Sequence, residues 1–474
     1  MNSTSRMILD VKTALIRDHL YLRSAPIQNW TTMEQHHHAP CQYTQTEPWR
    51  PIALGDTWRC ADGVTRRFRA RAVLPASDAG TPVLEIDFGG EGLVFINGTI
   101  ASALTSSEMN RAVRTRVNLE GLVRPGEEFD IEVESCLNFM EYRYRIHTGK
   151  DKDCVEYTLR RAAVAYVDDA IERYLFDLEN AIDALDTYQN PMGALAQSNA
   201  QPDPYMGAFL RALGRNGDIG PRLYRAILKS VTALDLELGE TALRASIPAA
   251  ASILNDQLSQ IDWHPRSEVL FLGHAHIDTA WLWPIKETVR KVGRTMANVL
   301  SLMNRYPDLI FSVSQPQLLK YLEDHYPTLF EALAARVKEG RIELVGNAWV
   351  EMDANVPSGE SLVRQLLYGR KYYLEKFGKC SDVFWMPDVF GYSWALPQIM
   401  ARAGVKYFYT SKLLNNDTNR FPHALFKWQG VDGTQTLAYL QRLNYNGVLR
   451  AKTIAEIDSL FDQRDVHNQA LMTV

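Results

Sequence analysis

Short apolar segments alternate with longer amphipathic segments in the second half of this chain of 474 residues. The apolar segments are residues 269–272, 310–313, 342–345, 383–386 and 405–409. In the segments between them, such as 287–306 and 360–377, apolar residues recur at the three- and four-residue spacing of an amphipathic helix. Repeated strand-then-helix order is typical of a parallel sheet covered by helices. We therefore predict a multidomain α/β protein in which residues 266–474 form a parallel (β/α) barrel.

The first half of the chain has a different periodicity. Apolar and polar residues alternate in 68–74, 83–88 and 129–133, which predicts strands with one buried face. The dipeptide Asn97-Gly98 is a strong signal for a hairpin turn. Residues 46–165 are therefore predicted to form a β-sandwich of jelly-roll type.

Two further regions complete the predicted organisation. Residues 166–265 have helical spacing and are expected to form a helical connector. Residues 1–45 are expected to form an amphipathic helix followed by a polar linker. The run His36-His37-His38 in this linker is expected to be an exposed loop, since three adjacent residues of a regular element cannot all face one metal ion.

Candidate metal ligands follow the first strand of the predicted barrel. His276 and Asp278 stand two residues apart, just after the apolar segment 269–272. Side chains at this end of a barrel strand point into the loops where active sites are built. An imidazole and a carboxylate two residues apart can face the same side and bind one cation of the zinc class. His274 is either a further ligand or a residue that contacts a ligand.

A second carboxylate occupies the equivalent place in another strand. Asp388 follows the apolar segment 383–386 and precedes a glycine turn and a predicted helix over 396–404. It is either a partner of His276 and Asp278 or only a cap of the following helix.

With these segments the chain resembles glycoside hydrolase family 38, the retaining α-mannosidases. The resemblance rests on residues 274–287, 339–365 and 385–404, which occur in the family's order and at natural spacing. It covers the chain from about residue 266 to its end. The resemblance implies hydrolysis of terminal α-mannosidic bonds, with a mannose-containing oligosaccharide or mannoside as the binding partner.

The same resemblance implies roles for particular residues. His276, Asp278 and Asp388 would hold a zinc ion or another divalent cation, and Asp388 would also be the catalytic nucleophile. Trp281 and Phe390 would form an aromatic floor under the sugar. The chemistry is coherent, because a cation keeps a bound carboxylate ionised and zinc with an open position can bind sugar hydroxyls.

Polar residues after the third predicted strand are further candidates. Glu351, Asp353 and Asn355 alternate along the chain beside the expected metal position. From this placement we expect hydrogen bonds to sugar hydroxyls.

The chain departs from the family pattern at two places. Asn415 follows Lys412-Leu413-Leu414, where the family's pattern has an aromatic residue, so the details of sugar recognition are in doubt. The sequence also ends at Val474, before the loop that carries the family's general acid and before a later zinc-binding histidine. We therefore expect the barrel to be incomplete and this chain alone to be inactive.

Composition excludes several classes of function. A net charge of −5 gives no broad attraction to nucleic acid or anionic membranes. No apolar run reaches the ~18 residues of a membrane span, and the N-terminus lacks the apolar core of a signal peptide. The five cysteines are scattered and odd in number, which predicts reduced thiols in a cytoplasmic protein. Assembly into a homo-oligomer is left open.

Two other functions use the same residues. A metal-dependent amidohydrolase would bind its metal through His274 and His276 together and would need more His and Lys ligands at later strand ends. A non-catalytic carbohydrate-binding protein would be expected to lack the three ligands, yet His276, Asp278 and Asp388 are all present.

Overall fold

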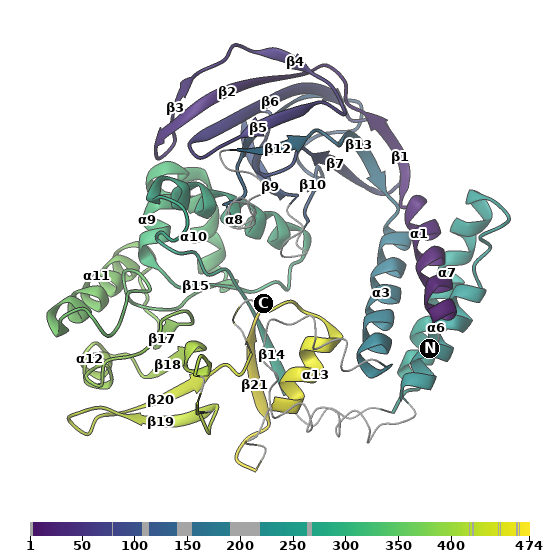
Figure 1. Cartoon of the computed structure of the whole chain (residues 1–474). Coiled ribbons are helices and arrows are strands. Elements are labelled where there is room, and N and C mark those ends of the chain that lie inside the picture. The colour runs from purple at the N-terminus through teal and green to yellow at the C-terminus, as the bar shows by residue number, and fades with distance from the viewer. Residues whose placement is uncertain are drawn as a thin grey trace.

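The computed structural model describes a mixed α/β chain made of antiparallel sheets, a group of helices, and parallel strands with helices between them (Figure 1). The described residues are 3–77, 79–106, 113–139, 154–189, 219–262, 268–416, 418–419, 421–443, 445, 447–460, 463 and 465–474.

Two antiparallel sheets form the upper part of the molecule in Figure 1. The larger sheet has the order β3-β2-β6-β11-β8-β9, with β4 also paired to β2. Its strands are β2 (Trp30–Ala39), β3 (Gln42–Gln45), β4 (Arg50–Ile52), β6 (Val64–Val73), β8 (Glu91–Ile96), β9 (Thr99–Thr105) and β11 (Glu128–Cys136). The smaller sheet, in the order β1-β13-β7-β10, consists of β1 (Tyr21–Pro26), β7 (Thr81–Asp87), β10 (Arg116–Asn118) and β13 (Arg161–Val167). A separate pair joins β5 (Thr57–Cys60) to β12 (Val155–Thr158).

The two sheets share one hydrophobic core. Phe68 and Ile131 enter it from the larger sheet, and Leu84 and Val164 enter it from the smaller sheet. All four side chains are buried. The alternation of apolar and polar residues in these strands is therefore explained by one face of each sheet packing on the other.

The predicted hairpin turn is present between β8 and β9. Asn97 and Gly98 both have positive φ, 49° and 77°. Asparagine and glycine are the residues that adopt this conformation at low cost, which is why the dipeptide marks the turn.

The predicted polar linker before residue 45 is wrong, because residues 21–45 supply β1, β2 and β3. β1 pairs with β13 and β2 pairs with β6, both antiparallel. The histidine run is part of β2, where His37 is buried and stacks on Tyr43 at 5.0 Å between ring centroids, while His36 and His38 are exposed. The polar residues of β2 gave no strand signal in the sequence. Their charges are paired by residues of strands distant in sequence, such as Arg66 of β6, which pairs with Glu34.

Four of the described helices pack together beside the sheets (Figure 1). They are α1 (Ser3–Asp18), α3 (Asp169–Gln189), α6 (Ile219–Thr232) and α7 (Glu240–Ser259). Leu9, Leu178, Ile227 and Leu254 contribute one buried side chain from each helix to their common core. The predicted boundary between this helical region and the parallel strands, at residue 265, lies outside the described residues.

Parallel strands begin at β14, and each of the five predicted apolar segments coincides with a strand to within two residues. One sheet has the order β16-β15-β14-β21, and its strands are β14 (Glu268–His274), β15 (Phe311–Val313), β16 (Ile342–Leu344) and β21 (Gln469–Thr473). The other has the order β17-β18-β20-β19, and its strands are β17 (Val383–Met386), β18 (Tyr407–Thr410), β19 (Leu425–Gln429) and β20 (Gln435–Leu440). All of these strand pairs are parallel except β19 with β20.

Helices connect these strands, as the repeated strand-then-helix pattern predicts. They are α8 (Ile285–Arg305), α9 (Pro316–His325), α10 (Pro327–Lys338), α11 (Gly359–Phe377), α12 (Leu396–Arg402), the 3₁₀ helix η1 (Lys412–Leu414) and α13 (Ala451–Leu460). Among the described helices, none combines the length and apolar character needed to cross a membrane.

Hydrogen bonds after β16 join the two parallel sheets. The Gly346 N–H donates to the Val383 carbonyl at 3.1 Å. The side-chain amide of the buried Asn347 donates to the carbonyls of Ser381 and Val383. These bonds hold the end of β16 beside the start of β17.

Helix α8 lies between the larger antiparallel sheet and the parallel strands (Figure 1). Leu93 and Ala103 of the antiparallel sheet share a core with Val289 and Met296 of α8 and with Phe311 of β15. The two halves of the chain are therefore packed through this helix.

Gly369 of α11 packs closely against the backbone of Asn347 and Ala348, and its substitution tests this contact. Alanine normally stabilises a helix interior relative to glycine by about 0.5–1 kcal/mol. At Gly369 an added Cβ would lie 2.1 Å from the carbonyl oxygen of Asn347. We expect Gly369→Ala to lower the free energy of unfolding by about 2 kcal/mol or more. In the same helix a Cβ added to Gly359 would meet nothing within 4 Å, so Gly359→Ala is the matched control. Thermal unfolding followed by circular dichroism measures both, and equal unfolding temperatures would contradict the close approach.

Candidate metal site

Three potential ligands meet where β14 and β17 end. His276 and Asp278 follow β14, and Asp388 follows β17. Donor atoms of these three side chains all lie within 4.8 Å of one another. His276 Nε2 is 3.2 Å from Asp278 Oδ1 and 3.3 Å from Asp388 Oδ2. The structure thus brings together the three residues that the sequence singles out as ligands.

These distances match those of ligands around a single small cation. Ligand atoms about 2.1 Å from one zinc ion in tetrahedral geometry lie about 3.4 Å from each other. The two distances from His276 Nε2 are close to this value. Imidazole nitrogen and carboxylate oxygen are also ligands that zinc accepts. The residues therefore fit a cation of the zinc class.

A buried carboxylate orients the His276 ring. Glu351 Oε1 lies 3.1 Å from His276 Nδ1, which leaves Nε2 directed at the two aspartates. The Ser314 hydroxyl donates to the same Glu351 oxygen at 3.1 Å, and the Glu351 N–H donates to the Gln315 side chain at 3.1 Å. An imidazole held by a carboxylate at its second nitrogen is the usual arrangement of a metal-binding histidine.

Glu351 was expected to contact sugar hydroxyls, which stays a prediction; in the structure it contacts His276. The sequence placed it correctly after the third strand. It could not show that Ser314 and Gln315 follow the neighbouring strand β15 and turn the carboxylate towards His276.

The surroundings of Asp388 keep its carboxylate ionised. Lys412 Nζ lies 2.7 Å from Asp388 Oδ1, and the Tyr445 hydroxyl donates to the same side chain. Burial raises the pKa of Asp388, but the hydrogen bonds from His276 and Lys412 outweigh it and lower the pKa to about 2. The group is therefore a permanent anion near neutral pH.

The same carboxylates act on His276. Burial lowers the pKa of this imidazole, but Glu351 and the hydrogen bonds to Asp278 and Asp388 raise it to about 12. In the metal-free protein His276 is therefore protonated. Even then, within the described part of the chain, three carboxylates face the two cationic side chains of His276 and Lys412. This excess of negative charge favours a bound cation.

Aromatic residues lie beside the carboxylates. Phe390 is 75% exposed, and its ring centroid is 4.9 Å from Lys412 Nζ. The Tyr445 ring is 5.2 Å from the same nitrogen and 5.3 Å from the His276 ring. Trp281 follows Asp278, is 56% exposed, and meets Trp283 edge to face at 5.8 Å. Exposed aromatic faces of this kind suit the C–H groups of a sugar.

Two predicted residues stand apart from the metal group. His274 Nε2 is 3.2 Å from the Ser314 hydroxyl, and burial followed by the charge of His276 lowers its pKa to about 3. His274 is therefore a neutral imidazole that contacts Ser314, the residue whose hydroxyl donates to Glu351. Asp353 is exposed, and its Oδ1 accepts backbone hydrogen bonds from Asn355 and Val356, each at 2.8 Å.

Lys412 and Tyr445 were not singled out as site residues. Lys412 follows β18, so the rule that placed Asp388 after β17 could have found it. Tyr445 lies between β20 and α13, where the sequence carries no comparable signal.

Fold and site together define a region of parallel strands and helices with a His–Asp–Asp group at its strand ends that could hold a cation. Residues 266–473 match the model of the Glycosyl hydrolases family 38 N-terminal domain. This part of the chain, 208 of its 474 residues, is therefore similar to that family's N-terminal domain.

Individual relatives carry the name α-mannosidase. The chain is 31% identical to human Alpha-mannosidase 2C1 over 437 residues, which cover 90% of this chain and 38% of that protein. It is 43% identical to Alpha-mannosidase of Saccharomyces cerevisiae over 175 residues, 37% of this chain and 16% of the yeast protein. A solved α-mannosidase from Enterococcus faecalis is 24% identical, with a TM-score of 0.36, over 44% of this chain and 24% of that chain. This chain therefore spans well under half the length of these relatives.

Glu351 provides a test of the metal geometry. Replacing it by alanine removes the carboxylate that orients His276, and such changes typically weaken metal binding by about 10–100-fold. We expect Glu351→Ala to raise the Kd for zinc by this factor in a competition titration with a chromophoric chelator. Glu343, an exposed carboxylate on β16, gives the control Glu343→Ala, for which no change is expected. An unchanged zinc Kd in Glu351→Ala would show that His276 is oriented by other contacts.

Proposed function

We propose that this chain carries the nucleophile and metal ligands of a retaining α-mannosidase that hydrolyses terminal α-mannosidic bonds in oligosaccharides or mannosides. The observation that carries the proposal is the approach of Asp278 and Asp388 to His276 at distances suited to one cation. The family 38 match over residues 266–473 and the α-mannosidase relatives support the same activity.

Asp388 is the nucleophile in this proposal. One carboxylate oxygen attacks the anomeric carbon while the bond from that carbon to the leaving oxygen breaks, and a general acid protonates the leaving oxygen. Water then attacks the glycosyl ester and releases mannose and free Asp388. The low pKa of Asp388 keeps the attacking oxygen deprotonated. We place the general acid outside residues 1–474, as the family resemblance implies.

Neighbouring residues position the reaction. His276, Asp278 and Asp388 would hold zinc or another divalent cation, which supplies charge stabilisation and an anchor for sugar hydroxyls. Lys412, 2.7 Å from Asp388 Oδ1, holds the carboxylate in place. Phe390 and Trp281 would supply the apolar floor for the sugar, and Asp353 would bind a hydroxyl at its edge.

We also infer the finer architecture and location. The shared core of the two antiparallel sheets supports a jelly-roll-like sandwich over residues 46–165. The parallel strand pairs support an incomplete (β/α) barrel over residues 266–474. The five free cysteines support a reducing, cytoplasmic location.

The amidohydrolase alternative is less well supported. It requires His274 and His276 on one metal, whereas His274 contacts Ser314 and does not belong to the His–Asp–Asp group. A binding protein without catalysis would need neither an ionised Asp388 nor the lysine that holds it.

Covalent labelling tests the role of Asp388 in this chain directly. A 2-deoxy-2-fluoro-α-mannosyl fluoride has a leaving group that needs little acid assistance, while its C2 fluorine slows hydrolysis of the covalent intermediate by destabilising the oxocarbenium-like transition state. We expect mass spectrometry of the zinc-loaded protein to find the fluoromannosyl group on Asp388. Asp388→Asn should lower the labelling rate on the order of 10³-fold or more.

The control for this experiment is Asp382→Asn. Asp382 precedes β17 and pairs on the surface with Lys406 at 2.7 Å, so its loss should leave labelling unchanged. A label on a carboxylate other than Asp388 would show that the nucleophile is misassigned, and no label at all would remove the support for a glycosidase.

A further inference from the structure

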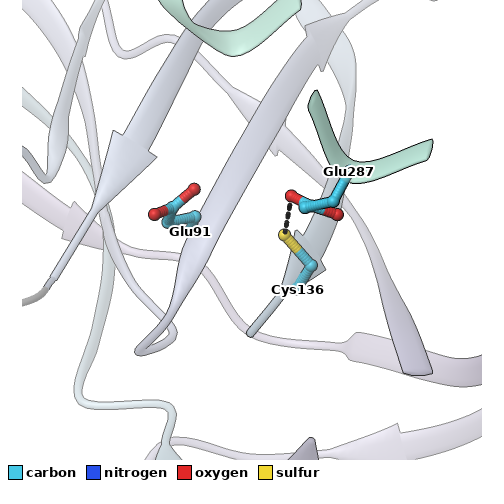
Figure 2. Close-up of side chains that lie close together, drawn as sticks. All are labelled: Glu91, Cys136 and Glu287. Carbon is cyan, nitrogen blue, oxygen red and sulfur yellow. Dashed lines mark hydrogen bonds between the residues drawn. The ribbon is translucent and has the colours of Figure 1, made fainter. Parts of the chain in front are cut away.

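A second group of potential ligands lies outside the candidate metal site. Glu91 of β8, Cys136 of β11 and Glu287 of α8 have donor atoms within 4.8 Å of one another (Figure 2). The Cys136 thiol points at Glu287 Oε1 across 3.9 Å. The group joins the antiparallel sheet to the first turns of α8.

This second group already contains its cations. Arg294 Nη2 lies 2.6 Å from both Glu91 Oε2 and Glu287 Oε1, and Lys291 Nζ lies 3.2 Å from Glu91 Oε1. Burial raises the pKa of Cys136 to about 12, so its thiol is neutral. A metal ion here would displace or face two buried cationic side chains. The group is therefore an ion-pair cluster and not a metal site.

The cluster extends along α8. Arg290 Nε lies 3.2 Å from Glu134 Oε1 on β11, and Arg290 Nη1 lies 3.4 Å from Glu287 Oε2. Arg290, Glu134 and Glu287 are each less than 10% exposed. Lys286 adds a short hydrogen bond to the carbonyl of His37 in β2.

Such a cluster fixes the rotation and register of α8. A shift or rotation of α8 that separated a buried charge from its partner would be strongly unfavourable, because an unpaired charge in a low-dielectric interior is costly. Apolar contacts alone would allow the helix to shift, since they lack direction. The ion pairs therefore define one position of α8 against the sheet.

The first turn of α8 holds the loop that carries the metal ligands. The hydroxyl of the buried Thr288 donates to the carbonyl oxygen of Asp278 at 3.2 Å and accepts from Trp283 Nε1 at 3.1 Å. Ile277, between the two predicted ligands, is buried in the same core as Leu93 of the antiparallel sheet. The loop is thus bonded to α8 and packed against the core that includes the sheet.

We propose that the antiparallel sheet increases the affinity of the metal site. Its buried ion pairs fix the first turn of α8, which holds His276 and Asp278 in position to bind the cation. Glu287 and Thr288 are positioning residues, acting through the loop without touching the cation. This inference rests on the proposed metal binding by His276, Asp278 and Asp388.

Zinc affinity of the 474-residue chain tests the inference. Glu287→Gln keeps the shape of the side chain and removes its charge, and Thr288→Val keeps the shape and removes the hydroxyl. We expect each to raise the zinc Kd about 10-fold, the lower end of the range for residues that orient metal ligands. Thr288→Ser retains the hydroxyl and should restore wild-type affinity. Circular dichroism confirms that each variant is folded before titration.

Glu323→Gln is the matched control for loss of a carboxylate ion pair. Glu323 of α9 bonds Lys376 and the Tyr372 hydroxyl of α11, away from the metal loop, so its zinc Kd should equal that of the wild type. If Glu287→Gln fails to fold, Thr288→Val and Thr288→Ser decide the result.

The outcomes separate this inference from the proposed function. Folded Glu287→Gln or Thr288→Val with the wild-type Kd would overturn the inference while leaving zinc binding intact. A wild-type chain that binds no zinc would overturn the proposed metal site itself.

Discussion

The imidazole of His276 has carboxylate oxygens of Asp278, Glu351 and Asp388 within 3.3 Å. Three carboxylates gathered around one imidazole repel one another in a partly buried site, so the arrangement needs cations to offset their charge. Lys412 and a protonated His276 supply part of this charge. A divalent cation in place of the His276 proton would supply the rest. Glu351, which contacts His276, is itself held by the Ser314 hydroxyl, which donates to its carboxylate, and by the Gln315 side chain, which accepts from its backbone N–H.

The positions of these carboxylates depend on contacts in distant parts of the fold. The candidate ligands belong to loops after two strands of different parallel sheets. Those sheets are joined after β16 by hydrogen bonds that include the buried Asn347. The loop after β14 is also bonded to α8, and α8 is bonded to the antiparallel sheet by buried ion pairs. The similarity to human Alpha-mannosidase 2C1 covers 90% of this chain, and thus includes the antiparallel sheets as well as residues 266–473, which match the family 38 model.

Sequence patterns predicted the parts of the structure that depend on local periodicity. The parallel strands and the helices between them follow from apolar spacing, and the position of ligands after strands follows from the geometry of parallel sheets. The sequence could not predict features that depend on distant partners. β2 was missed because its polar residues pair with charges on distant segments. Glu34 of β2, for example, pairs with Arg66 of β6 at 2.7 Å. Tyr445 was missed because only the folded loop brings its hydroxyl to Asp388.

Asp353 and Glu351 illustrate the same limit within the site. Both follow β16, and alternation suggested that they act together. The backbone turns after Asp353, whose carboxylate accepts hydrogen bonds from its own loop, while Glu351 is directed inward to His276. Hydrogen bonds in the folded structure decide the direction of each side chain, and the spacing of residues in the sequence does not predict these bonds.

X-ray diffraction from zinc-soaked crystals, recorded at the zinc absorption edge, tests the central claim most directly. The account predicts an anomalous peak about 2.0–2.2 Å from His276 Nε2 and from carboxylate oxygens of Asp278 and Asp388. Absence of a peak at these residues, or a peak at Glu91, Cys136 and Glu287 instead, would contradict it.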